Sequence, residues 1–263
     1  MKRIPIFGWF WIIVGGFYFL FPLIATFLWS LQKKRDALGF SAYQSAFSDP
    51  NFIENFGISL LYSALTILVA IVLIVPSAYW VHLRLPRLRP MMEFISSLPF
   101  VIPPIILVFG IIGVYSKPPL QLTVNKLTTT GLLIAGYLVL ALPYMYRSVD
   151  LGLRAMDVST LTEAAQSLGA NSFAILFRVV LPNLRTALVS GSLITLATVM
   201  GEYVLAQYLV LPAFAPFLWL EVQDKAYEPA ALSLVSFGLT WIAMGAIYFA
   251  SRGRTQAPLA AGH

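Results

Sequence analysis

The chain has 263 residues, of which 59% are hydrophobic and 11% are charged, and its mean hydropathy is +0.82. These values lie far from those of ordinary globular domains and indicate a protein whose main solvent is lipid. Lys and Arg number 17 against 11 Asp and Glu, but the basic residues stand between apolar runs, which argues against nucleic acid as a partner. The absence of cysteine excludes disulfides, thiolate metal sites and cysteine nucleophiles.

The first apolar run, residues 8–31, follows a short basic start at Lys2 and Arg3. It is too long for the apolar region of a secretory signal and lacks a clear cleavage site of small residues. We therefore interpret it as a retained membrane span.

Six segments reach the length of about 20 residues that a helix needs to cross the hydrocarbon core. They are residues 8–31, 56–81, 94–115, 127–146, 186–211 and 232–251. Unpaired backbone groups cannot face lipid, and the runs lack the alternation of barrel strands, so the predicted fold class is all-α. The sequence thus predicts a polytopic membrane protein with six transmembrane helices in one domain, residues 1–263.

Prolines recur inside these spans, and each frees a backbone carbonyl that lipid cannot satisfy. Such helices either kink within the bundle, or line a wet cavity and move. The pattern does not separate these two possibilities. The residues concerned are Pro22, Pro76, Pro99, Pro103, Pro104 and Pro143, with Gly201 as a further break.

The basic residues also predict the orientation, because cytoplasmic loops hold an excess of Lys and Arg. With the N-terminus inside, the inner side holds 11 of the 17 and the outer side 6. The inner set is Lys2, Arg3, Arg84, Arg87, Arg89, Arg147, Arg154, Arg178, Arg185, Arg252 and Arg254, and the outer set is Lys33, Lys34, Arg35, Lys117, Lys126 and Lys225. The triplet after the first span is the exception, but three separate inner segments oppose it. Both termini are predicted to be cytoplasmic.

Two histidines stand apart from each other, His82 at the end of the second span and His263 at the last position. With no carboxylates nearby in the sequence, they predict no metal site.

The loop between the fourth and fifth spans, residues 147–185, is the longest predicted cytoplasmic segment. Thr160 and Glu163 match a capping box at the start of a helix. One face of that helix then follows at spacings of three and four: Leu161, Ala164, Ala165 and Leu168. Gly169 is typical of the left-handed residue that ends a helix.

A second helix is predicted directly after this glycine, with Asn171 and Ser172 as possible caps. Its apolar face has the same spacing: Phe173, Leu176, Phe177 and Val180. Pro182 is expected to break the helix before the next span. Residues 160–177 contain no basic residue, which disfavours a helix bound to lipid headgroups and favours packing into a protein groove.

The stretch EAAQSLG, followed nine residues later by VVLP, resembles the signature of inner-membrane permease subunits of binding-protein-dependent ABC importers. The matching positions are Glu163, Ala164, Ala165, Gly169, Val179, Leu181 and Pro182. Valine replaces the more usual isoleucine. Six spans with this loop between the fourth and fifth match the family's arrangement, so the resemblance covers the whole chain.

The resemblance implies the fold of a type I ABC importer permease in the cell inner or plasma membrane. It implies that the loop is a coupling helix that docks on a cytoplasmic ATP-binding subunit, with Leu168 among the contact residues. Its further implied partners are a second permease subunit, identical or paralogous, and an extracytoplasmic solute-binding protein. The stretches 98–111 and 201–217 are similar to permeases of the polyamine-importer subfamily. Spermidine or putrescine is therefore the expected substrate, with ferric ion, thiamine, sulfate or molybdate as alternatives.

Glu202 is the acidic residue placed well inside a predicted span, about 24 Å from its inner end at 1.5 Å per residue. A charge there is costly, so the carboxylate is expected to face the bundle interior or an interface. Either it lies on the pathway of a cationic substrate, or it is a structural acid that reaches a polar region.

The sequence contains no Gly-x4-Gly-Lys-Ser/Thr motif, so the chain is not expected to bind nucleotide or to be an enzyme, and no cofactor is expected. ATP hydrolysis is assigned to a separate subunit. An intramembrane serine protease would need a Ser–His pair within the membrane, which the two histidines do not provide. A secondary transporter would couple through buried acids and repeated halves, and one acid with no visible repeat argues against it.

Overall fold

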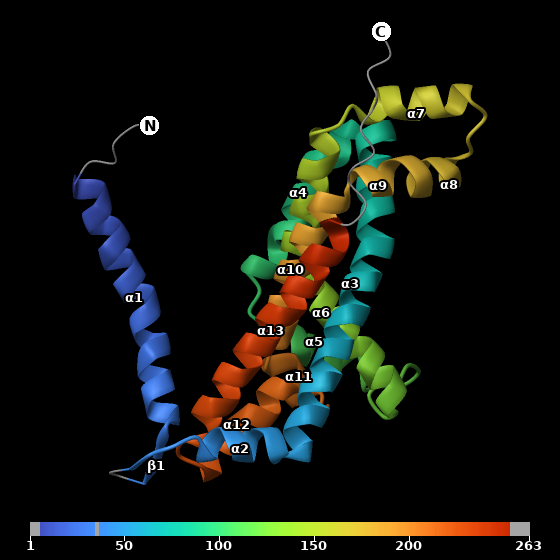
Figure 1. The fold of residues 1–263 in the computed structure, drawn as a ribbon. Coiled ribbons are helices and arrows are strands. Elements are labelled where there is room, and N and C mark those ends of the chain that lie inside the picture. Colours follow the sequence, from blue (N-terminus) through green and yellow to red (C-terminus); the bar gives the residue numbers. More distant parts are fainter. Residues whose placement is uncertain (1–5, 35–36, 253–263) are drawn as a thin grey trace. The chain divides into compact units, whose positions relative to one another are not determined.

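The computed structural model describes residues 6–34 and 37–252, and within them it is almost entirely helical (Figure 1). This confirms the predicted all-α class. The first helices are α1 (Ile6–Ser30), α2 (Ser41–Ser48), α3 (Pro50–Arg84), α4 (Arg89–Ser97), α5 (Pro104–Tyr115) and α6 (Lys126–Arg154). They are followed by α7 (Val158–Ser167), α8 (Ser172–Ile175), α9 (Leu181–Asn183), α10 (Arg185–Met200), α11 (Val204–Tyr208), α12 (Phe214–Asp224) and α13 (Glu228–Arg252). Short 3-10 turns lie at Pro86–Leu88 and Leu98–Phe100, and a π-helical turn lies at Leu176–Val180.

Two short strands, β1 (Gln32–Lys34) and β2 (Ala37–Leu38), follow α1 and pair in antiparallel fashion. Gln32 lies opposite Leu38 in this pairing. Nothing in the sequence pattern predicts the strands, because three residues are too few for the alternation of a strand to be recognised.

The chain forms two compact units. The first contains the residues up to Phe56 together with Phe217–Leu239, and the second contains Gly57–Pro216 with the residues from Thr240. Within the first unit, the indole Nε1 of Trp29 donates a hydrogen bond to the carbonyl oxygen of Ala226 at 3.1 Å. The predicted coupling loop belongs to the second unit.

Four single helices are long and apolar enough to cross a membrane: α1, α3, α6 and α13. Two further candidates are pairs of helices that bend sharply at a break, so the described residues hold up to six spans. The segment predicted as one span at 94–115 belongs to such a pair, which bends by 98° between Phe100 and Pro104. Prolines 99, 103 and 104 remove backbone donors at this point and account for the break.

The span predicted at 186–211 is not a single helix either. α10 ends at Met200, Gly201 follows as its C-cap, and α11 begins only at Val204. Val210 then has a φ of 55°, which is strained for a β-branched residue. Gly201 marks the first break in the sequence, whereas nothing marks Val210, because the residues around it are apolar.

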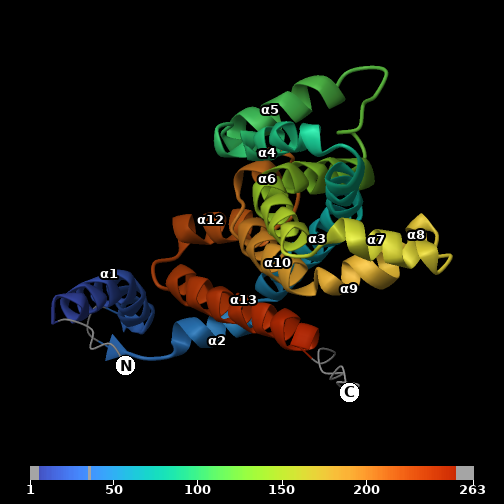
Figure 2. The same ribbon diagram turned by 90° about the horizontal axis from the view of Figure 1, so that it is seen from above.

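The core of the second unit is built around α6 and α10, which lie side by side (Figure 2). Glycines permit their close approach. A Cβ atom added to Gly152 would lie 2.7 Å from the Cβ of Ala187, and one added to Gly191 would lie 2.7 Å from the sulfur of Met145. Because side chains are absent at these two positions, the backbones of α6 and α10 come close enough to bury the apolar residues between them.

We expect Gly152→Ala to destabilise the protein, because the new methyl group fits only if α6 and α10 separate. Overpacking of this kind costs about 1–3 kcal/mol. Gly131→Ala is the matched control in the same helix, since a Cβ there meets nothing within 4 Å. The measurement is thermal unfolding of both variants in one detergent. Equal stability of the two would contradict tight packing at Gly152.

Candidate functional site

The predicted loop folds into two helical arms joined at a glycine, and we call residues 158–183 the elbow. Figure 1 shows α7 and α8 at one end of the second unit, where they run across the axis of α3. The first arm is α7, which begins three residues earlier than predicted. Its N-cap is Asp157, whose carboxylate accepts hydrogen bonds from the backbone N–H of Thr160 at 3.1 Å and from its hydroxyl at 2.7 Å.

The predicted capping box at Thr160 and Glu163 is therefore wrong. Thr160 lies inside the first turn of α7 and donates to the cap instead of forming it. The two hydrogen bonds that Thr160 donates hold the pKa of the Asp157 carboxyl below its ordinary value. Aspartate is a stronger N-cap than threonine, and its position just before a helix-forming stretch was the signal that would have located the true start.

The predicted apolar face of α7 is divided between two environments. Val158 and Thr162 are buried, and the Thr162 hydroxyl lies 3.0 Å from the hydroxyl of Tyr79 on α3. Ala165 is partly buried against the core, whereas Ala164 is exposed. The buried and partly buried stripe of Val158, Leu161, Thr162 and Ala165 thus lies three residues before the predicted one, and Ala165 supports the fold.

Gly169 ends the first arm as predicted, with a φ of 81°. The N–H of Gly169 donates to the carbonyl of Gln166 at 2.8 Å, and the N–H of Ala170 donates to the carbonyl of Ala165 at 3.0 Å. This pair of bonds is a Schellman motif, which requires the left-handed conformation that glycine adopts without strain.

The second arm starts at α8, and Asn171 is its N-cap, as predicted. The Asn171 side chain accepts a hydrogen bond from the backbone N–H of Ala174 at 2.8 Å. The buried residues of this arm are Ile175 and Val180, and Leu184, which follows the arm, is buried too. The buried face differs from the predicted apolar face, because the π-helical turn adds a residue to the repeat and rotates the side chains that follow. Of the predicted face, Val180 is buried in the core, whereas the two phenylalanines, 173 and 177, point outward.

The predicted break before the next span lies directly after Pro182. This residue lies in the first turn of α9, a position that proline tolerates, and the chain bends by 74° between Asn183 and Arg185. Val179 and Leu181 pack against the core, and Pro182 is partly buried. The second half of the sequence signature is therefore directed into the bundle.

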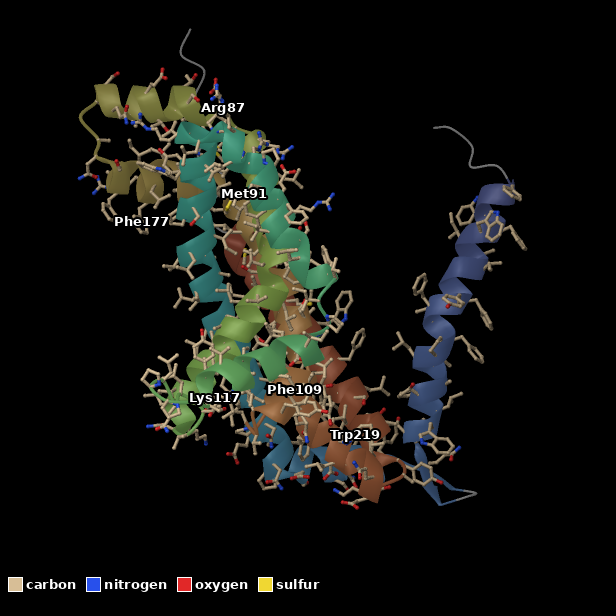
Figure 3. All side chains as sticks on the ribbon, turned by 180° about the vertical axis from the view of Figure 1, so that it is seen from behind. Arg87, Met91, Phe109, Lys117, Phe177 and Trp219 are labelled. Atoms are coloured by element: carbon tan, nitrogen blue, oxygen red, sulfur yellow. The ribbon has the colours of Figure 1, made fainter. Side chains whose placement is uncertain are left out.

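The outer surface of the elbow is apolar in part. Leu168 is 89% exposed, Phe173 75% and Phe177 60%. Glu163 and Ala164 of α7 are exposed as well. We call these five residues the outer face, and Figure 3 shows the elbow projecting from the bundle with Phe177 at its surface.

A groove of about 390 Å³ runs between the elbow and α3. Its walls are mainly apolar and include Trp80 on α3 with Phe173 and Phe177 on the second arm. The outer face and this groove together form a surface that suits an apolar protein partner.

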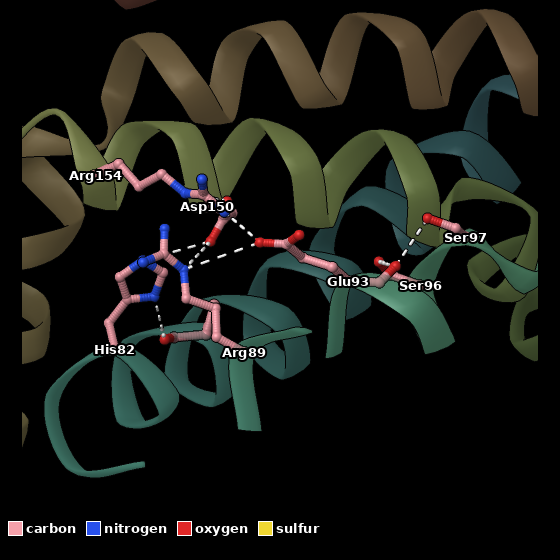
Figure 4. Close-up of polar contacts among 8 residues, drawn as sticks. His82, Arg89, Glu93, Ser96, Ser97, Asp150 and Arg154 are labelled. Carbon is pink, nitrogen blue, oxygen red and sulfur yellow. Dashed lines mark hydrogen bonds and ion pairs between the residues drawn. The ribbon is translucent and has the colours of Figure 1, made fainter. Parts of the chain in front are cut away.

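An ion cluster centred on the buried Asp150 lies next to the elbow, and the sequence pattern did not reveal it (Figure 4). Asp150 on α6 lies 3.4 Å from His82 Nε2, 3.3 Å from Arg89 Nε and 2.7 Å from Arg154 Nε. Arg154 also pairs with Glu93 on α4. The cluster joins the ends of α3, α4 and α6, and it corrects the expectation that His82 has no carboxylate near it.

This cluster does not assemble a metal site. Within residues 6–34 and 37–252, no group of three or more His, Cys, Asp or Glu residues could hold a metal ion. The second predicted histidine, His263, lies outside the described residues.

Glu202 is 9% exposed and lies at the break between α10 and α11. Its carboxylate accepts hydrogen bonds from the backbone N–H groups of Val204 at 2.8 Å and Leu205 at 3.0 Å. The acid thus caps α11, which gives it a structural role that the sequence pattern left open. A role on the substrate pathway stays a prediction.

Glu202→Gln tests that pathway role, because the amide keeps one acceptor for α11 and loses the charge. If the charge receives a cationic substrate, uptake should fall by about tenfold or more while thermal stability changes little. Glu202→Ala also removes the cap and should cost about 0.5–2 kcal/mol. Unchanged uptake kinetics for Glu202→Gln, with a destabilised Glu202→Ala, would assign the residue a structural role alone.

Comparison with known proteins connects this architecture to transport. A family model described as "Binding-protein-dependent transport system inner membrane component" matches residues 70–254. The fold is similar to a chain in the crystal structure of a bacterial ABC transporter involved in the import of the acidic polysaccharide alginate, with a TM-score of 0.71, 16% identity and coverage of 93% of both chains.

Three curated relatives are named after different substrates. The spermidine/putrescine transport system permease protein PotB of Haemophilus influenzae is 28% identical over 57% of this chain. The sulfate transport system permease protein CysW of Synechocystis is 27% identical over 90% of both chains. A probable molybdenum ABC transporter permease of Haloferax volcanii is 31% identical over 72% of this chain and 71% of its own. The match spans 56% of the Haemophilus protein's length.

Proposed function

Because this chain belongs to the family of binding-protein-dependent transport system inner membrane components, we propose that it is a permease subunit of an ATP-driven importer. It would form half of a transmembrane pathway for a small solute that a binding protein delivers. The observation that carries this proposal is the elbow, which presents an exposed outer face while its inner side is packed into the bundle.

The elbow is built to transmit movement. On its inner side, Thr162 is hydrogen-bonded to Tyr79 of α3, and Ile175 and Val180 are buried in the core around α6. A partner that pushes on the outer face would therefore move α3 and α6 with it, since packed interiors transmit displacement with little compression. We assign the outer face to an ATP-binding subunit, which couples nucleotide hydrolysis to the pathway.

The remaining partners of this proposal are a second permease subunit and an extracytoplasmic binding protein. We place the chain in the cell inner or plasma membrane with both termini and the elbow in the cytoplasm. The excess of basic residues on that side supports this orientation.

The orientation can be tested with single cysteines, because the chain has none of its own. Ser45 and Ser167 are both exposed, and Ser167 lies on the elbow. An impermeant thiol reagent added to intact cells should label Ser45→Cys and spare Ser167→Cys, and inside-out vesicles should reverse this result. Labelling of Ser167→Cys in intact cells would show that the orientation is inverted.

For the substrate we propose spermidine or putrescine, supported by the resemblance of residues 98–111 and 201–217 to polyamine permeases and by the name of the Haemophilus relative. Sulfate and molybdate are the competing solutes, because the other relatives carry those names. Uptake of radiolabelled spermidine, sulfate and molybdate by the complete transporter would decide among them. Saturable uptake of an oxyanion without spermidine uptake would reject the polyamine proposal.

The transport mechanism is tested in proteoliposomes that contain the chain with its partner subunits. Uptake should require ATP and the binding protein, and it should persist when an ionophore collapses the ion gradients. Uptake that follows an ion gradient without ATP would instead identify a secondary transporter.

A further inference from the structure

The apolar groove of about 390 Å³ beside the elbow has a buried floor and an exposed rim. Val75 and Tyr79 of α3 and Ile175 of the second arm are buried and form the floor. Val72 and Trp80 of α3, which are 60% and 50% exposed, stand at the rim. The volume lies within the range of about 300–1,000 Å³ that is typical of ligand pockets. A ligand of mainly apolar character therefore fits the groove.

The groove follows α3 over the depth of one membrane leaflet. α3 is one of the four single helices that are long and apolar enough to cross a membrane. The wall on α3 begins at Ile71, and Trp80 stands where an indole ring typically meets the headgroups. At 1.5 Å per residue these two residues lie about 14 Å apart along the helix axis. Half of a hydrocarbon core of about 30 Å is about 15 Å, so the groove has the length of one leaflet's apolar layer.

The groove becomes polar at one end. Arg84 lines it one helical turn after Trp80, together with Gln166 and Ser172 of the elbow. Arg84 is exposed, and in the part of the chain that the structure describes it forms no ion pair. Its guanidinium can extend to a headgroup phosphate while the groove holds hydrocarbon. The apolar wall, the tryptophan and the cation thus follow the polarity of a phospholipid from its acyl chain to its phosphate.

The second arm limits what can enter the groove. This arm crosses the axis of α3 (Figure 1), and Phe177 lies on the side of the arm that is turned away from α7 (Figure 3). A transmembrane helix is about 10 Å wide, and one that followed the groove along α3 would run into the second arm. An acyl chain ends at its headgroup and does not meet this obstacle. The proposed ATP-binding subunit would approach the outer face from the cytoplasm and not from the hydrocarbon.

We propose that this groove binds a membrane phospholipid, with one acyl chain along α3 between Ile71 and Trp80 and the phosphate beside Arg84. The chain packs against Phe173 and Phe177 of the second arm, so it supports the elbow from the membrane side. Binding of the lipid does not require the ATP-binding subunit, and it can therefore be measured on the chain alone.

Thermal unfolding of the purified full-length chain in a neutral detergent tests this site. Phosphatidylcholine, added to about 100 times its Kd, should raise the unfolding temperature by roughly 5–10 °C. Val72→Trp puts an indole ring at the rim of the groove and should remove most of that increase. Leu73→Trp is the matched control, because Leu73 is the next residue of α3, is also exposed and does not line the groove. Equal increases in the two variants, or no increase in the unaltered protein, would overturn the proposal.

Arg84→Gln tests the position of the phosphate. The phospholipid concentration at half of the maximal temperature increase should rise about 2–5-fold, which is the effect expected of an exposed ion pair. Arg87→Gln is its control, because Arg87 is also exposed and does not line the groove. Equal concentrations for the two variants would overturn the placement of the phosphate beside Arg84.

A protein segment is the alternative occupant of the groove. Val72→Cys, modified with a photoactivatable thiol reagent, is placed in the assembled transporter in phosphatidylcholine liposomes. We expect a covalent product with the phospholipid, detected by mass spectrometry of the chain. A product with another subunit in its place would overturn the proposal.

Discussion

Gly169→Val is expected to reduce ATP-driven uptake by roughly tenfold or more while leaving membrane insertion intact. The residue has a φ of 81°, and a β-branched side chain in that region is strained by about 1–3 kcal/mol. Each 1.4 kcal/mol changes an equilibrium tenfold, so the turn should relax and the Schellman bonds should be lost. The outer face would then be aimed away from its partner.

The matched control is Gly169→Asn, because asparagine tolerates the left-handed conformation. Space does not limit either variant, since a Cβ at this position meets nothing within 4 Å. The asparagine variant should therefore keep most of its uptake and its capture of the ATP-binding subunit. Full uptake and full capture by Gly169→Val would show that the angle of the elbow has no part in coupling.

Asp150→Ala is expected to cause the largest loss of stability. This carboxylate is the buried partner of His82, Arg89 and Arg154, and its removal leaves cations uncompensated beside the core. Breaking a buried ion pair from one side costs about 3–5 kcal/mol. For a chain of this length the unfolding temperature should fall by roughly 6–20 °C.

Glu93→Gln is the control for this prediction. Its side chain is half exposed and belongs to the same cluster, so losing its charge should cost only about 0–1 kcal/mol. Both variants are compared by thermal unfolding in the same detergent. Equal effects of the two substitutions would contradict the central place of Asp150 in the cluster.

Helix positions could be predicted from the sequence because apolar runs of sufficient length have few other solutions in lipid. Gly169 was recognisable because its conformation is a local property of one residue. The faces of the elbow were predicted less well, since the π-helical turn at Leu176–Val180 changes the repeat on which an apolar pattern is read. The prolines near residues 103 and 182 indicated breaks, but not the size of the bends, because hydropathy measures polarity and not direction.

The ion cluster could not be predicted from the sequence for a different reason. His82 and Asp150 lie on different helices and far apart in the chain, and a single sequence does not show which distant residues meet. Glu202 presents the intermediate case. The sequence showed that a charge inside this apolar segment is energetically costly. It did not show that the helix breaks there and leaves the N–H groups of α11 free to bind the Glu202 carboxylate.

The central claim, that the outer face of the elbow contacts an ATP-binding subunit, is tested most directly by site-specific cross-linking. A single cysteine in Leu168→Cys, modified with a photoactivatable thiol reagent, is placed in the assembled transporter beside Ser45→Cys as the control. We expect Leu168→Cys to give a covalent product with the ATP-binding subunit, and Ser45→Cys to give none. A product at Ser45→Cys with none at Leu168→Cys would contradict the claim.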